Sequence, residues 1–255
     1  MTSALRSFLA PLKRIFLSGA HSTVGNLFRQ HLSSKAHGDQ YENYLKLMLE
    51  GGQLDTDSFQ YKILNSRSFQ EEWLDSPSVP LIKSVNAAII NNPDLKICID
   101  LGSGTGWVAN LLSEKFSRVV AIEPSASAIE ISKHYFRNGF ASNIEWKHGF
   151  AEKVLLEEDD LTGPIFVFTG VVLSHTPNSV ATKILKFINE SLALGSEGLL
   201  IEAWGSPRSE SLWHIRSKTW WQENLSNCEL DFYGPERENM PGEYLGLKFK
   251  KVMHI

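Results

Sequence analysis

The sequence has only two cysteines among its 255 residues, Cys98 and Cys228, and they lie far apart. Such a pair makes no disulfide framework, so we expect a reducing, cytoplasmic compartment. No run of about 18 apolar residues occurs, which argues against a transmembrane helix. The eight histidines show no H-x-x-x-H spacing and the cysteines no C-x-x-C spacing, so we predict no metal site.

Several enzyme motifs are also missing. The chain has no G-x-S-x-G nucleophile turn, no G-x-x-x-x-G-K-[ST] phosphate loop and no N/D-P-P-Y/F sequence of amino-methylating DNA enzymes. A net charge of −4 and the lack of a basic groove give no reason to expect a nucleic-acid partner. A hydrophobic fraction of 42% and a charged fraction of 21% are ordinary for a soluble globular protein.

Residues 1–38 contain no acidic residue and carry a charge of +5. The remaining residues therefore carry −9, which gives the net charge of −4. Their apolar residues recur at helical spacing, which predicts a basic amphipathic arm. Three interpretations stay open: the arm packs on its own domain or a partner, lies on a membrane surface, or serves as a mitochondrial targeting segment. The apolar residues are Leu5, Phe8, Leu9, Leu12, Ile15 and Phe16.

Residues 39–95 read mostly as helices. One apolar face comprises Tyr41, Tyr44, Leu45, Met48 and Leu49. Further helices are predicted over residues 68–74 and 80–90, because Pro80 suits a helix start and Pro93 closes the second one.

From Lys96 onward, short apolar runs alternate with helical patterns. This alternation predicts an α/β fold with a doubly wound, mostly parallel sheet and helices on both faces. Expected strands are 96–101, 119–122, 144–148, 165–173 and 199–201, and expected helices are 107–116, 126–135, 179–194 and 217–225. Two last strands, 229–233 and 247–252, have no helix between them and are expected to pair antiparallel.

A glycine-rich loop follows the first of these strands. Gly102, Gly104 and Gly106 allow a tight turn and the close approach of a ligand, and the next helix offers free N–H groups. Their G-x-G-x-G spacing differs from the dinucleotide G-x-G-x-x-G pattern. Asp100 before the loop suits a cofactor that carries positive charge. Glu123, 23 residues later, ends the next strand, where a carboxylate can accept both hydroxyls of a ribose.

With these features, residues 96–255 resemble the class I S-adenosylmethionine-dependent methyltransferases. The resemblance rests on residues 100–106, 121–125, 149–152 and 168–177. It implies a seven-stranded sheet with an antiparallel last strand and S-adenosylmethionine as cofactor. It also implies that the helices of residues 39–95 form a cap over the substrate.

The resemblance assigns the glycine loop to the methionine part of the cofactor and Glu123 to its ribose. Residues 150–152 would flank the adenine. Phe150 stands where many members carry Asp or Asn, so Glu152 is the polar candidate there. The implied cofactor residues are Asp100, Gly102, Ser103, Gly104, Thr105, Gly106, Glu123, Pro124, Phe150, Ala151, Glu152, Thr169 and Gly170.

Two histidines are the catalytic candidates. His175 lies just past the fourth strand, where ligands of open α/β sheets bind, and is expected to be a base or an orienting group. A purely local hydrogen-bonding role stays open for it, and a surface position stays open for His214. Glu202 is a candidate for function or structural pairing. Weaker candidates near the C-terminal hairpin or the tryptophan-rich stretch are Tyr233, Glu243, Tyr244, Trp204, Trp213, Trp220 and Trp221.

The sequence therefore predicts a methyltransferase that acts on an oxygen or nitrogen atom of a small or medium polar metabolite, such as a sugar-bearing or natural-product intermediate. The alternatives are a protein side chain as acceptor, a non-catalytic domain that binds the cofactor or a partner, and an oxidoreductase with an atypical nicotinamide loop.

Overall fold

The computed structural model describes residues 45, 67–74, 79–135, 141–158, 160–170, 172–202, 214–233 and 245–253. Residues 1–38 lie outside this part of the chain, so the predictions about the basic arm stay predictions. Of the apolar face expected near residue 45, only Leu45 is described, and it is buried.

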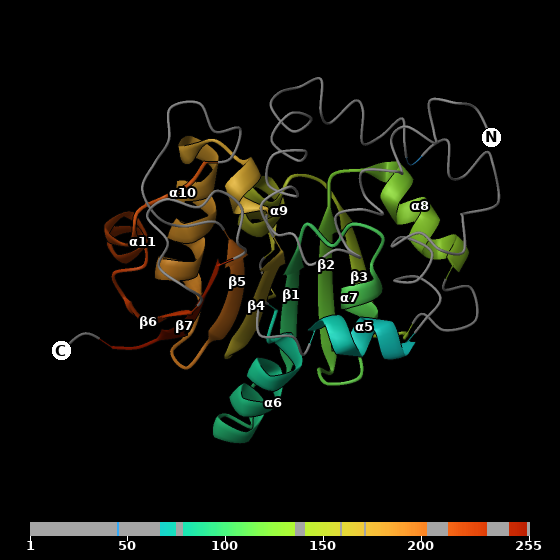
Figure 1. Cartoon of the computed structure of the whole chain (residues 1–255), viewed down its shortest axis with the longest axis horizontal. Helices are drawn as coiled ribbons and strands as arrows, with labels where there is room; N and C mark the ends of the chain where they lie inside the picture. The colour runs from blue at the N-terminus through green and yellow to red at the C-terminus, as the bar shows by residue number, and fades with distance from the viewer. Residues whose placement is uncertain are drawn as a thin grey trace.

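One sheet organises the described residues (Figure 1). Its seven strands have the order β3-β2-β1-β4-β5-β7-β6. Strands β1 to β5 run parallel, whereas β7 is antiparallel to both β5 and β6. The predicted fold class and the antiparallel last strand are therefore confirmed. The strands are β1 (Ile97–Leu101), β2 (Arg118–Glu123), β3 (Ile144–His148), β4 (Ile165–Gly170), β5 (Glu197–Glu202), β6 (Cys228–Tyr233) and β7 (Leu245–Lys251).

The helices lie on both faces of this sheet, as predicted. They are α5 (Arg67–Leu74), α6 (Leu81–Asn91), α7 (Trp107–Leu112), α8 (Ala126–Tyr135), α9 (Ala151–Glu157), α10 (Asn178–Lys186) and α11 (Lys218–Asn224). A 3₁₀-helix, η1 (Leu173–His175), precedes α10, and a π-helical turn, η2 (Phe187–Ser191), follows it.

Alternating side chains of the buried strands build two cores. Cys98 of β1 joins the core under α6 and α7, whereas its neighbour Ile99 joins the core under α9, α10 and α11. Successive strand residues point to opposite faces, so a parallel strand that is covered on both faces must be apolar throughout. The edge strand β3 is only partly buried and instead alternates apolar and polar residues, as in the pattern that predicted it.

The structure differs from the predicted elements at the end of β4, at the end of α7 and over α9. Strand β4 ends at Gly170 and not at residue 173, because the carboxylate of Glu202 accepts the N–H groups of Leu173 and Ser174. Helix α7 ends at Leu112, before the expected residue 116. Helix α9 was not predicted, because it is only seven residues long and its apolar pattern is correspondingly short.

Helix α6 packs on the sheet, and its C-terminal end lies near the start of β5. Leu81, Val85 and Ala88 lie in the core beside β1 and β4. At the helix end, the Asn92 amide donates to the carbonyl of Gly195, just before β5. The described part of the segment 39–95 thus covers a face of the sheet. The cap over the substrate stays a prediction for the rest of that segment.

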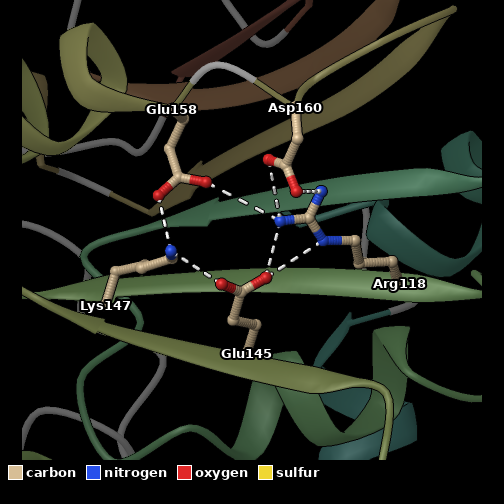
Figure 2. Close-up of polar contacts among 5 residues, drawn as sticks. All are labelled: Arg118, Glu145, Lys147, Glu158 and Asp160. Atoms are coloured by element: carbon tan, nitrogen blue, oxygen red, sulfur yellow. Dashed lines mark hydrogen bonds and ion pairs between the residues drawn. The ribbon is translucent and has the colours of Figure 1, made fainter.

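Five charged residues form a network of ion pairs at the edge strand β3 (Figure 2). Glu145 forms ion pairs with Arg118 and Lys147, each with an N–O distance of 2.6 Å. Lys147 also forms an ion pair with Glu158 at 2.6 Å. Asp160 lies 3.2 Å from the Arg118 guanidinium. These contacts raise the pKa of Lys147 to about 12 and lower that of Glu145. Charged side chains on an edge strand oppose pairing with another strand.

Among the described residues, no helix is both long and apolar enough to cross a membrane.

Candidate active site

The glycine loop connects β1 to α7 in a left-handed backbone conformation. The φ angles are 69° at Gly102, 55° at Gly104 and 77° at Gly106, values that side chains other than glycine adopt only with strain. The N–H groups of Gly102 and Ser103 donate to the carbonyl of Ile122 at 2.8 and 3.0 Å. The loop is thereby held against the carboxyl end of β2.

Two of these glycines also accommodate side chains of the protein itself. A Cβ on Gly102 would lie 2.3 Å from Cγ2 of Val172, and a Cβ on Gly106 would lie 2.3 Å from the Trp146 ring. From the sequence, these glycines were expected to allow the close approach of a ligand. Packing against Val172 and Trp146 is a second physical reason for glycine at these two positions.

Asp100 lies under this loop and is almost fully buried, at 1% exposure. The Ala109 backbone N–H bonds to its carboxyl group, but Oδ2 has no hydrogen-bond partner within the described parts of the chain. Burial, and secondly the charge of Glu123, raise the pKa of Asp100 to about 8. A buried carboxyl with an unsatisfied oxygen is stabilised by a cation or a donor placed against it.

Glu123 ends β2 and orients the loop through backbone N–H groups. Its Oε2 accepts the N–H of Gly104 at 2.8 Å, and its Oε1 accepts the N–H of Ser125 at 2.9 Å. The side chain is buried, at 5% exposure. A carboxylate fixed in this position is a hydrogen-bond acceptor at the carboxyl end of β2, beside the glycine loop.

The loop after β3 lies next to the end of β2. The N–H of Gly149 donates to the Glu123 carbonyl at 3.1 Å, and the His148 ring lies 3.1 Å from the Pro124 carbonyl. Phe150 follows with its ring exposed, at 59%. Ala151 then begins α9, with Glu152 in the first turn. This arrangement brings the predicted ribose and adenine residues to one edge of the sheet.

The two predicted cofactor residues at the end of β4 differ in exposure. The Thr169 side chain is buried, and its hydroxyl donates to the Glu202 carboxylate. Gly170 is exposed. Of these two residues, therefore, only Gly170 offers a surface to a ligand.

The two histidine candidates are brought together by a backbone hydrogen bond. The N–H of His214 donates to the carbonyl of Ser174, the residue before His175, at 2.9 Å. His175 is half-buried in η1, whereas His214 is exposed. Partial burial, and secondly the charge of Arg216, lower the pKa of His214. The structure thus places the backbone of both candidate histidines near the carboxyl end of β4.

Arg216 was not a candidate from the sequence, yet it is only 3% exposed. It bonds to the loop that carries His175, and Glu202 bonds to the same loop from the sheet side. An arginine two residues after a surface histidine gave no sign of burial in the sequence. Glu202 was expected to have either role, and its hydrogen bonds are those of a structural partner.

The remaining aromatic candidates differ in burial. Trp221 lies fully in the core, and Trp220 stacks on the Arg216 guanidinium at 4.6 Å. Burial, and secondly the charge of Glu202, raise the pKa of Tyr233. Glu243, Tyr244, Trp204 and Trp213 lie outside the described residues.

A cavity of about 510 Å³ lies elsewhere, lined by residues of α5, α6 and α7. None of the predicted cofactor or catalytic residues lines it, and its rim contains Glu71, Glu72 and Glu114. We assign no cofactor to it, because Asp100, Glu123 and the strand ends lie outside its lining. Within the described ranges, no three His, Cys, Asp or Glu side chains group to hold a metal ion.

Comparisons with known proteins agree with this arrangement. Residues 98–195 match the family model described as a methyltransferase domain. No curated protein sequence matches the chain. The solved PH0226 protein from Pyrococcus horikoshii has a TM-score of 0.55 at 16% identity, over 74% of this chain and 93% of its own.

Two further solved structures have similar scores. CalS10, an amino pentose methyltransferase from Micromonospora echinaspora, gives 0.52 at 11% identity, over 72% of this chain and 97% of its own. A SAM-dependent methyltransferase from Anabaena variabilis gives 0.51 at 15% identity, over 86% and 96%. At such identities the likeness is one of fold. Together with the family match, it shows that residues 98–195 belong to a methyltransferase domain and that the described sheet has the class I methyltransferase fold.

Proposed function

We propose that this protein transfers a methyl group from S-adenosylmethionine to an oxygen or nitrogen atom of a small or medium polar metabolite. The observation that carries the cofactor assignment is the unsatisfied, buried Oδ2 of Asp100 beneath a glycine loop. Asp100 and Glu123 are neighbouring carboxyl groups, and a cationic amine or sulfonium placed beside them would favour the carboxylate form of Asp100. A pyrophosphate would be repelled at the same place.

Each part of the cofactor has residues that fit it. Asp100 and the loop 102–106 would hold the methionine part, and the fixed carboxylate of Glu123 would accept the ribose hydroxyls. The exposed Phe150 ring is available to flank the adenine, with Glu152 as the nearby polar group. When bound, S-adenosylmethionine supplies an electrophilic methyl group on sulfur.

The chain's own part in the reaction is orientation and proton transfer. In-line displacement needs the acceptor atom aligned with the methyl group and water kept away. His175 lies beyond the carboxyl end of β4 and would take the proton that the acceptor's O–H or N–H loses. Its neighbour His214 has a lowered pKa and is therefore mainly neutral near pH 7, as a proton acceptor must be.

A small polar acceptor is supported by His175, whose loop bonds to the His214 backbone, and by CalS10, an amino pentose methyltransferase of similar fold. A protein side chain as acceptor is the alternative.

Isothermal titration calorimetry of the full-length protein tests the cofactor. We expect saturable binding of S-adenosylmethionine and no binding of NAD; the reverse result would overturn the proposal. Incubation of a small-molecule extract and of a protein extract with radiolabelled S-adenosylmethionine then separates the two acceptor classes. Label only in protein would refute the metabolite assignment.

A further inference from the structure

The loop between β4 and α10, residues 172–178, is held from two sides by charged groups. On the sheet side, the Glu202 carboxylate accepts the N–H of Leu173 at 3.0 Å and the N–H of Ser174 at 2.7 Å. It also accepts the Thr169 hydroxyl. Glu202 therefore satisfies donors that the end of β4 leaves without sheet partners.

On the other side, the Arg216 guanidinium donates to the acceptors of the same loop. Nη1 donates to the Leu173 carbonyl at 2.6 Å, and Nη2 donates to the Thr176 carbonyl at 2.7 Å. Nε donates to the Asn178 side chain at 3.0 Å. These three bonds bracket His175 on both sides along the chain.

The geometry needs an arginine specifically. Three different nitrogens of one planar group reach three different residues, and a fourth bond joins Nη1 to the His214 carbonyl at 3.2 Å. The Trp220 ring supports the guanidinium from one face at 4.6 Å. A lysine ammonium is a point charge and cannot make this fork of bonds.

This arrangement is costly for stability alone. Arg216 is 3% exposed, and burial lowers its pKa to about 10, so it still carries its charge near neutral pH. The described residues give it no direct ion pair; Glu202 acts on it only through its field. A buried charge is weak evidence for stability, since apolar groups of similar volume often serve as well. What the fork adds is one fixed geometry for the loop.

We propose that Arg216, together with Glu202, is a positioning residue that sets the orientation of His175 and holds the His214 segment beside it. The position of the loop follows from the contacts above; the role of His175 in methyl transfer rests on the proposed function. Arg216 itself touches no reacting atom, because its donors point to the loop carbonyls.

The test compares Arg216→Met, Arg216→Lys and the control Arg118→Met in the full-length protein. Arg118 is an equally multivalent arginine in the ion network beside β3, remote from the loop. The readouts are the NMR titration of the His175 imidazole, amide hydrogen exchange of residues 173–176, and calorimetric affinity for S-adenosylmethionine.

We expect Arg216→Met to move the His175 titration midpoint and to speed exchange of residues 173–176 by roughly tenfold or more. Arg216→Lys should give an intermediate result, and Arg118→Met should match the wild type. An unchanged His175 titration in Arg216→Met, or an equal change in Arg118→Met, would overturn the proposal. If Arg216→Met does not fold, Glu202→Gln provides the same comparison with less loss of contacts.

These readouts keep the two proposals apart. A wild-type protein that binds no S-adenosylmethionine contradicts the proposed function, yet the titration and exchange comparison still decides the role of Arg216. Conversely, normal cofactor affinity with an unmoved His175 rejects only the positioning role.

Discussion

Asp100 lies one residue before the end of β1 and Glu123 ends the neighbouring parallel strand β2, and the charge of Glu123 adds to burial in raising the pKa of Asp100 to about 8. The two carboxyl groups therefore titrate as interacting neighbours. Glu123 is tied to backbone N–H groups, whereas Asp100 keeps an oxygen without a partner. This asymmetry makes Asp100 the group whose protonation a bound cation would change.

Cofactor affinity should therefore depend on pH through Asp100. A bound cation favours the carboxylate form, so affinity should rise as the pH increases from 6 toward 8. Asp100→Asn should weaken binding by about tenfold or more and remove this dependence. Calorimetry at three pH values, in both proteins, measures it. Titration of the cofactor's own amine affects both proteins alike, so an equal pH slope in the variant would contradict the prediction.

The same residue should influence folding stability. Its folded-state pKa is raised from 3.8 to about 8, so its contribution to the free energy of unfolding is fully present below pH 3.8 and is lost progressively as the pH rises through about 8. Asp100→Asn removes the cost of the buried charge. The free energy of unfolding of the variant, relative to that of the wild type, should therefore be higher at pH 8 than at pH 5. Urea unfolding at the two pH values provides the comparison; a constant difference would refute it.

Glu123→Ala should lose most of the cofactor affinity, because it removes the predicted ribose acceptor and leaves the N–H groups of Gly104 and Ser125 without that partner. We expect a loss of at least about tenfold, measured by calorimetry. Glu145→Ala is the control, since it also removes a strand carboxylate but lies in the ion network. Affinity unchanged in Glu123→Ala would refute the ribose assignment.

Gly102→Ala should destabilise the protein for two separable reasons. The left-handed φ of 69° costs about 1–2 kcal/mol for a residue with a Cβ. The contact with Val172 Cγ2 adds a clash of about 1–3 kcal/mol. In Gly102→Ala/Val172→Ala the clash disappears and only the first cost remains. Denaturant unfolding of the two single variants and the double variant gives the coupling free energy. Strict additivity would show that Val172 does not constrain the glycine.

The ion network beside β3 should contribute to stability only above acidic pH. Lys147, and secondly Arg118, lower the pKa of Glu145 below 4.5, so its contribution is present above that pH and is lost as the pH falls further. The carboxylate is 40% exposed, so the effect is modest, about 1 kcal/mol or less, and screened by salt. Glu145→Gln should flatten the acid limb of the stability curve. Unfolding of both proteins between pH 3 and 6 checks this.

The parts of the fold that the sequence predicted depend on local signals. Apolar runs located the inner strands and alternation located β3, and the lack of a helical pattern in the sequence between residues 233 and 247 predicted the antiparallel pair. Strand ends were less predictable, because the end of β4 is set by Glu202, 29 residues away from Leu173.

The candidate site divides in the same way. The glycine loop, Asp100 and Glu123 stand in one stretch of chain whose spacing is readable. Arg216 is distinguished only by burial and by bonds to residues 40 and 43 positions earlier. No local pattern carries that information. The contacts of Arg216 with the loop of His175 were therefore harder to predict from the sequence than the glycine loop, Asp100 and Glu123.

The late position of Arg216 has a consequence for biosynthesis. A nascent chain that has emerged only through β5 already contains the glycine loop, Glu123 and Glu202. The guanidinium that completes loop 172–178 lies 43 residues beyond Leu173, in a later part of the polypeptide. The glycine loop and Glu123 can therefore form their contacts while synthesis continues, whereas the Arg216 bonds to loop 172–178 form only after residue 216 has left the ribosome.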